Sequence, residues 1–188
     1  IYMWNLTGLK ESGLDETDFN LGWSGDLSGF KLDVGFGYWD LRNRFGSGGL
    51  QTDYWNVWTE VGWDMLTVFD IFKVFFYVRP EWVEPVKENS EFSEGGFQGA
   101  IGLRPEWKAG ELIFPLTLKG DLRAVYDSGL YGGKSAWIGR LTAQASWQVL
   151  DNVSIILPGV DFSQPFAGNL EDGRGTELVA FMGISLSF

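Results

Sequence analysis

The sequence predicts an all-β fold, in the form of a transmembrane antiparallel up-and-down β-barrel of about ten strands. Three observations carry this prediction. Apolar residues alternate with polar or small ones along most of the chain, short and long connections follow each other in turn, and aromatic residues make up 16% of the 188 residues. Successive side chains of a strand point to opposite faces, so the alternation gives each strand one apolar and one polar face.

The expected strands follow from the alternation and from the turn residues that interrupt it. The pattern is clearest near the end of the sequence, where every second residue from Leu178 to Phe188 is apolar. In chain order we expect strands at Ile1–Leu9, Asp18–Gly25, Phe30–Asp40, Tyr54–Asp64, Val68–Trp82, Gly96–Trp107, Leu112–Tyr126, Ala136–Val149, Val153–Phe162 and Thr176–Phe188. Most of these segments approach the length that a tilted membrane strand requires.

The connections between the expected strands alternate in length. Short ones are expected at residues 26–29, 65–67, 108–111 and 150–152, with longer polar connections between the other neighbours. This order is typical of a meander with tight turns at one end of a barrel and long loops at the other. We expect a single domain over residues 1–188, while about eight strands, or about twelve with a further hairpin before Ile1, stay open as alternatives.

Composition excludes several classes of function. No apolar run is long enough for a membrane-spanning helix, so a membrane protein with this sequence would have to be a barrel. The chain has no cysteine and no histidine, which removes thiol chemistry, the usual general base and the commonest metal ligand. Its net charge of -11 disfavours nucleic acid as a partner. We therefore expect no enzymatic activity, no cofactor and no bound metal, although Glu60 and Asp64 lie on one strand face and could act as a carboxylate pair.

Side-chain volume decides which face of the strands points outward. The apolar face carries large residues such as Phe36, Val61 and Phe76, and the interior of a narrow barrel cannot hold them all. The opposite face combines glycines such as Gly35 and Gly62 with charged residues, which fit an interior but do not suit lipid. A soluble β-sandwich or lipocalin-like barrel, with the apolar face packed in a core, is the rival interpretation.

This orientation predicts two sets of residues. The charges expected to line the lumen are Lys31, Asp33, Glu60, Asp64, Lys73, Arg79, Arg104, Lys119, Asp121, Arg123, Arg140 and Glu177. The aromatic residues expected to form belts at the two membrane interfaces are Trp55, Trp63, Trp82, Trp107, Trp137 and Trp147. At ~3.3 Å per residue and a tilt of about 40°, Trp137 and Trp147 are separated by roughly 25 Å of membrane normal, the height of an apolar band.

Four segments carry a resemblance to a known family: DETDFN at residues 15–20, GFKLDVGFGYW at 29–39, YWNVWTEVGW at 54–63 and ISLSF at 184–188. With them the chain resembles the bacterial outer-membrane β-barrel superfamily, and its middle resembles the porin-like barrels of Gram-negative envelopes. The resemblance implies an integral outer-membrane protein in contact with lipid and lipopolysaccharide. It also implies that Phe188 is the terminal aromatic signal read by the barrel-assembly machinery.

The leading functional hypothesis is a narrow, porin-like channel for ions or small polar solutes. The alternative is a structural barrel with an occluded lumen that docks other envelope proteins. Lys119 and Arg123, with Arg140 on the next strand, predict a cationic wall facing the side that carries Asp33, Glu60 and Asp64, an arrangement that orients solutes in a constriction. Five acidic residues around one expected loop are interpreted as solvated charge, with divalent-cation binding as the alternative: Glu81, Glu84, Glu88, Glu91 and Glu94.

Overall fold

The fold was analysed in a computed structural model, which describes residues 2–7, 17–40, 53–86, 95–109, 115–129, 134–150, 153–168 and 176–186. The described residues form ten β-strands. Their bounds are β1 Tyr2–Thr7, β2 Thr17–Leu27, β3 Phe30–Asp40, β4 Tyr54–Val68, β5 Phe72–Pro85, β6 Gly96–Ala109, β7 Leu116–Asp127, β8 Ala136–Leu150, β9 Val153–Gly168 and β10 Glu177–Leu186. The long connections expected from the sequence lie largely outside the described residues.

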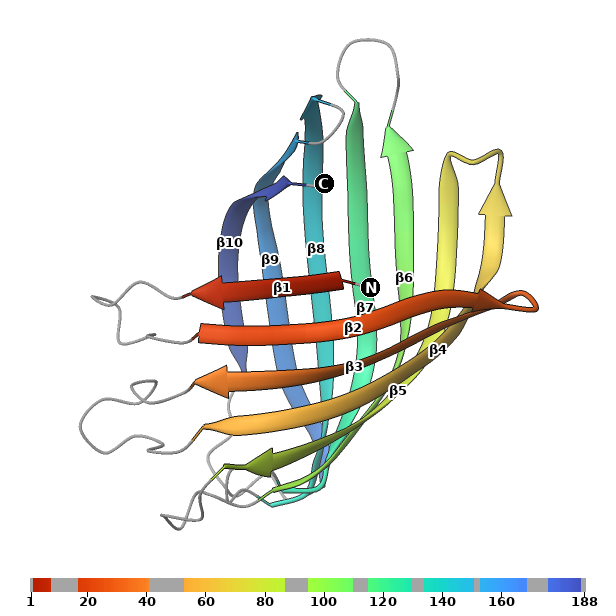
Figure 1. Ribbon diagram of the computed structural model, residues 1–188. Coiled ribbons are helices and arrows are strands. Elements are labelled where there is room, and N and C mark those ends of the chain that lie inside the picture. The colour runs from red at the N-terminus through yellow and green to blue at the C-terminus, as the bar shows by residue number, and fades with distance from the viewer. Residues whose placement is uncertain are drawn as a thin grey trace.

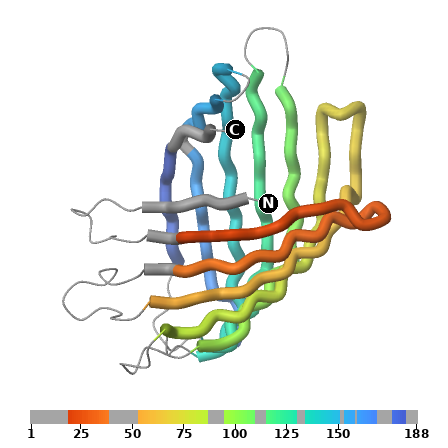
Figure 2. The backbone as a smooth tube through the Cα atoms, in the orientation of Figure 1, coloured from red at the N-terminus to blue at the C-terminus, as the bar shows by residue number. Residues whose placement is uncertain are grey.

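The ten strands form one antiparallel sheet in which each strand pairs with its neighbours in the sequence, from β1 to β10. This confirms the all-β, up-and-down fold class. Figure 1 shows that the sheet is strongly curved, so that β2, β3 and β4 cross in front of β7, β8 and β9 at a steep angle, and Figure 2 shows the same curl in the backbone trace. Within the described residues no ladder joins β1 to β10, so the sheet is not closed.

The tight turn between β2 and β3 lies where the sequence predicts it. Leu27 pairs with Phe30, and the two residues between them, Ser28 and Gly29, both have positive φ, of 52° and 91°. This is the backbone of the two-residue turns that match the twist of a hairpin, and glycine adopts it without strain.

Several predicted strand ends are wrong, among them the start of β5, which is Phe72 and not Val68, and two have a clear local reason. β4 does not end at Asp64 but continues to Val68, because a bulge between Asp64 and Leu66 lets the ladder to β5 resume. The turn therefore falls at Phe69–Ile71 instead of 65–67. β9 continues six residues beyond Phe162 and passes through Pro165, where the register to β8 shifts. Proline lacks an amide hydrogen, and a bulge is where a strand accommodates it.

The sheet buries its polar face and exposes its apolar face. Along β4 the even-numbered residues from Tyr54 to Gly62 are buried, including Asn56 and Glu60, whereas Val57 and Val61 between them are exposed. We call the two sides the polar face and the apolar face. Large apolar side chains are exposed on most strands, for example Phe19, Phe36, Trp63, Trp82, Ile101, Trp107, Leu122, Trp137 and Leu141. A soluble protein buries most such residues in a core, and in the described part of the chain the apolar face has no core packed against it.

Candidate functional site: the polar face of the sheet

All twelve charges predicted to line a lumen lie on the polar face. The register places them in rows that run across the strands. One row contains Asp64, Arg104 and Asp121, which follow one another through the pairs Asp64–Phe75 and Phe75–Arg104. The next row joins Arg123 to Arg140, Arg140 to Ser163 and Ser163 to Glu177. Because each strand pairs with its neighbours in the sequence, a row brings together residues from consecutive strands.

Arg104 is the centre of an ion-pair network on this face. Its guanidinium forms a bidentate pair with Glu60, in which Nη2 donates to Oε2 at 2.7 Å, and its Nε donates to Oδ2 of Asp121 at 3.3 Å. Tyr77 completes the network, since its hydroxyl donates to Asp121 Oδ1 at 2.8 Å and its ring lies 3.9 Å from the guanidinium carbon. Arg104 thus joins β4, β5, β6 and β7, and the sheet must curve for it to reach Glu60 across β5.

A second layer of contacts lies nearer the long-loop end of the strands. The Trp58 indole donates to Asp33 at 2.8 Å and covers Gly35, where any Cβ would clash with the ring. The Arg79 guanidinium lies 5.1 Å from the Trp58 ring and 3.3 Å from the Glu81 carboxylate. Asn56, which also hydrogen bonds to Glu81, is buried as well. This layer is densely packed, and it is built largely of aromatic and buried polar groups.

The cations of β7 and β8 are compensated locally. Lys119 lies 3.4 Å from Glu106, Arg123 lies 3.7 Å from Asp121, and Arg140 lies 3.8 Å from Asp161. The cationic wall expected from the sequence is therefore interleaved with carboxylates.

The structure also separates the Glu60 and Asp64 pair considered for acid–base chemistry. Glu60 is paired with Arg104, while Asp64 is paired with Lys31 at 3.2 Å. Each carboxylate has its own cation, so both are held by ion pairs and neither is singled out as a proton acceptor.

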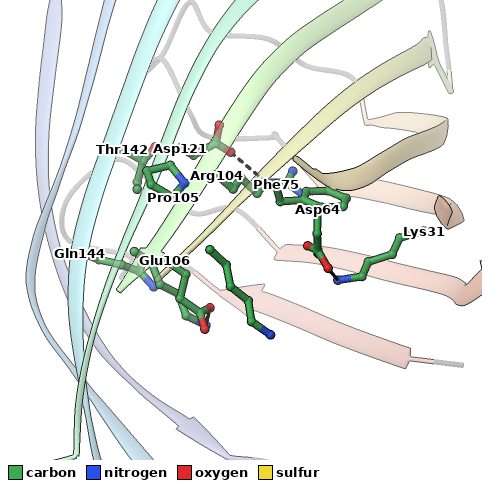
Figure 3. A pocket seen from close by; sticks show the side chains of 12 residues that line it. Lys31, Asp64, Phe75, Arg104, Pro105, Glu106, Asp121, Thr142 and Gln144 are labelled. Atoms are coloured by element: carbon green, nitrogen blue, oxygen red, sulfur yellow. Dashed lines mark hydrogen bonds and ion pairs between the residues drawn. The ribbon is translucent and has the colours of Figure 1, made fainter. Parts of the chain in front are cut away.

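The polar face lines a partly open cavity of about 520 Å³ beside the Arg104 network. Its lining comes from six consecutive strands, β3 to β8, which shows how far the sheet wraps around it. Figure 3 shows Lys31 and Asp64 on one side of this space, and Asp121, Thr142 and Gln144 on the other. The Arg104 and Phe75 side chains lie between these two groups.

Several buried polar atoms on this face have no acceptor or donor within the described part of the chain. They include the Nε atoms of Arg79, Arg123 and Arg140. Buried polar groups in native proteins are almost always hydrogen-bonded to protein or water. These guanidiniums are therefore suited to a hydrated interior, and an apolar filling would not satisfy them.

The two ends of the polar face differ in accessibility. At the long-loop end Tyr54, Asn56 and Val83 are almost completely buried. At the tight-turn end the side chains of Lys31 and Lys119 are 52% and 50% exposed. The polar face is therefore covered at one end and accessible at the other.

Sequence reasoning missed part of this site. It did not place Trp58, Phe75 or Tyr77 on the polar face, and it assigned Glu81 to an acidic loop. The signal that could have found them is strand parity, since residues two positions apart on a strand share a face. Trp58 has the parity of Glu60 on β4, and Glu81 has the parity of Arg79 on β5. Three of the five acidic loop residues, Glu88, Glu91 and Glu94, lie outside the described residues, and within the described part no group of three or more acidic residues could hold a metal ion.

The six predicted belt tryptophans all lie on the apolar face. Four of them, Trp63, Trp82, Trp107 and Trp137, are exposed, while Trp55 and Trp147 are half-buried. Trp55, Trp82 and Trp137 are near the long-loop end of their strands, and the other three are near the tight-turn end. Neighbouring rings contact them, as in the Tyr126–Trp137 pair with centroids 5.3 Å apart. Phe188, the predicted assembly signal, lies outside the described residues.

Comparison with known proteins gives no relative: no family model, no curated protein and no solved structure matches this chain. In the part of the chain that the structure describes, no helix is long and apolar enough to cross a membrane. The function must therefore be argued from the two faces of the sheet.

Proposed function

We propose that this protein is an outer-membrane β-barrel whose polar interior is a narrow path for ions or small polar solutes. The observation that carries the proposal is the inversion of the sheet, with buried carboxylates and half-buried guanidiniums on one face and exposed tryptophan, phenylalanine and leucine on the other. Exposed apolar surface of this extent needs an apolar environment, and lipid supplies it. The proposal includes closure of the sheet by its edge strands, because hydrocarbon does not tolerate unpaired strand edges.

The position of the aromatic residues supports a membrane crossing. Tryptophans on the apolar face gather near both ends of the strands, as rings do at the two water interfaces of a bilayer. The strand number in the described residues is even and tight turns gather at one end, which is the organisation of bacterial outer-membrane barrels. In this proposal the partners are outer-membrane lipid and lipopolysaccharide, the barrel-assembly machinery during biogenesis, and other envelope proteins.

The polar cavity supports a path for solutes. Charges of both signs line it, and the unsatisfied guanidinium nitrogens nearby favour water inside. The narrowest part of such a path would be the layer of Trp58, Arg79 and Glu81. Rings of charged side chains at a constriction are a common source of ion selectivity in pores.

A second candidate function is a structural barrel with a closed interior. The dense packing around Trp58 favours it, because the ring covers Gly35 and is itself only 4% exposed. In this case the interior charges hold the strands together, and the protein serves as an anchor or docking surface.

Single-channel recording in planar lipid bilayers separates the two candidates. We expect small, steady conductance steps from the wild-type protein, and roughly a twofold increase for Trp58→Ala, which widens the narrowest layer. The matched control is Trp63→Ala, which removes the same side chain from the same strand but on the apolar face, and its conductance should equal that of the wild type. Absence of current from both the wild type and Trp58→Ala, with folding verified by circular dichroism, would refute the channel and support the closed barrel.

A further inference from the structure

The accessible end of the interior contains an unusual concentration of lysine side chains. Lys31, Lys73 and Lys119 all line the cavity of about 520 Å³, and they come from β3, β5 and β7. The chain as a whole carries a net charge of -11, so a lysine-rich cavity is a local exception to its composition.

The register explains how two of these lysines share one row. Lys73 pairs with Glu106 on β6, and Glu106 pairs with Lys119 on β7. Neighbouring strands are about 4.8 Å apart, so the two lysines begin roughly 10 Å apart on either side of one carboxylate. That carboxylate lies 3.4 Å from Lys119.

The Lys73 side chain has no ion pair and no hydrogen bond with any residue in the described ranges, in contrast to its neighbours. Lys31 is held by Asp64 at 3.2 Å and lies 5.3 Å from the Phe75 ring centre. Arg104, the fourth cation of the lining, is already bound by Glu60 and Asp121. Over the whole lining, four cations stand against the three carboxylates of Asp64, Glu106 and Asp121, an excess of one positive charge.

The far side of the cavity offers neutral hydrogen-bonding groups. Gln144 is the register partner of Lys119, and Thr142 is the register partner of Asp121. An amide and a hydroxyl can donate to oxygens of a ligand whose charge the lysines neutralise. The volume is that of a small-molecule site and leaves room for a hydrated ion, since one water takes about 30 Å³.

We propose that this cavity is a binding site for small oxyanions of the phosphate class, with Lys73 as the principal cation and Lys31 and Lys119 at its sides. A small anion with several acceptor oxygens can bind several separated ammonium groups at once, which a single-atom anion cannot do as well. The idea that this cavity is the entry site of a solute path rests on the proposed function. Binding of the anion itself requires only that the polar face is folded.

Binding is tested by isothermal titration calorimetry of inorganic phosphate into the folded protein in a neutral detergent at constant ionic strength. We expect a saturable signal, weakened about fivefold to tenfold in Lys73→Gln and largely kept in Lys73→Arg, because one screened charge contributes about 1 kcal/mol. The matched control is Lys134→Gln, the same charge change at an exposed residue just before β8 that does not line the cavity.

The results separate this inference from the proposed function. Saturable binding that depends on Lys73 supports the site even if bilayer recordings show no current, in which case only the channel fails. Equal weakening in Lys73→Gln and Lys134→Gln would show unspecific attraction to positive charge and overturn the site. Absence of saturable binding in the wild type, with current still present in bilayers, would overturn the site and leave the channel standing.

Discussion

At the scale of the residue, the network around Arg104 shows why a charge can be kept inside this sheet. Glu60 is nearly buried, and an isolated carboxylate there would lose its hydration without compensation. The bidentate pair with Arg104 supplies that compensation, while the Asp121 carboxylate accepts from Nε of the same guanidinium and from the Tyr77 hydroxyl. The charges therefore stabilise one another only as a complete set.

We predict that Arg104→Met lowers the free energy of unfolding by about 2 kcal/mol. Breaking a fully buried pair costs roughly 3–5 kcal/mol, and the partial exposure of Arg104 reduces that cost. A second substitution, Glu60→Gln in the Arg104→Met background, should recover part of the loss because it removes the uncompensated charge. Urea unfolding in lipid vesicles measures both, and a double variant less stable than Arg104→Met would contradict the account.

At the scale of the element, the two tight hairpin turns that the structure describes solve the same backbone problem with different residues. Ser28–Gly29 and Phe69–Asp70 both have positive φ at their two positions. Glycine accepts this region freely and aspartate, as at Asp70, tolerates it, whereas a bulky residue such as Phe69, with φ of 48°, is strained there. Phe69 is also 90% exposed, so packing within the described fold does little to offset its strain.

We predict opposite effects of substitution in these two turns. Phe69→Asn should raise the free energy of unfolding by about 1 kcal/mol, because asparagine tolerates left-handed backbone in hairpin turns. Gly29→Ala should lower it by about 1 kcal/mol, because the added Cβ is strained at this φ although it meets no neighbour. Thermal or urea unfolding measures both changes, and a destabilised Phe69→Asn would mean that the phenylalanine ring has a stabilising contact outside the chain.

Strand positions could be predicted from the sequence to the extent that turn residues mark them. β3 has the predicted bounds, Phe30–Asp40, because it begins after Ser28–Gly29. The end of β4 could not be predicted, since no glycine or proline marks the turn at Phe69–Ile71 and the bulge after Asp64 interrupts the alternation. For the site, the alternation predicts on which face of the sheet a side chain lies. It does not predict the curvature of the sheet, and the contact between Arg104 and Glu60 depends on that curvature.

At the scale of the whole molecule, the two faces of the sheet have opposite relations to solvent. Leu122 on the apolar face of β7 is 56% exposed, while Thr142 on β8 lines the polar cavity. If lipid covers the apolar face, as proposed, a charged side chain costs more free energy at Leu122 than at Thr142, although the two residues are on neighbouring strands.

We predict that Leu122→Lys lowers the free energy of unfolding in lipid vesicles by roughly 2–4 kcal/mol, the cost of lysine at the bilayer midplane. Thr142→Lys, the control on the polar face, should change it by less than about 1 kcal/mol because the new ammonium stays in the polar interior. Urea titration followed by tryptophan fluorescence measures both. Equal effects of the two substitutions would show that the apolar face does not meet hydrocarbon.

The difference between the covered and the accessible end of the polar face has a consequence for transport under an applied voltage. A solute arriving at the lysine end loses its hydration shell gradually, with ammonium groups taking the place of water. A solute arriving at the opposite end first meets the Trp58 layer, where the charges of Arg79 and Glu81 are already paired with each other. In a closed barrel of this construction, currents driven in the two directions would be unequal, and the molecule would act as a rectifier.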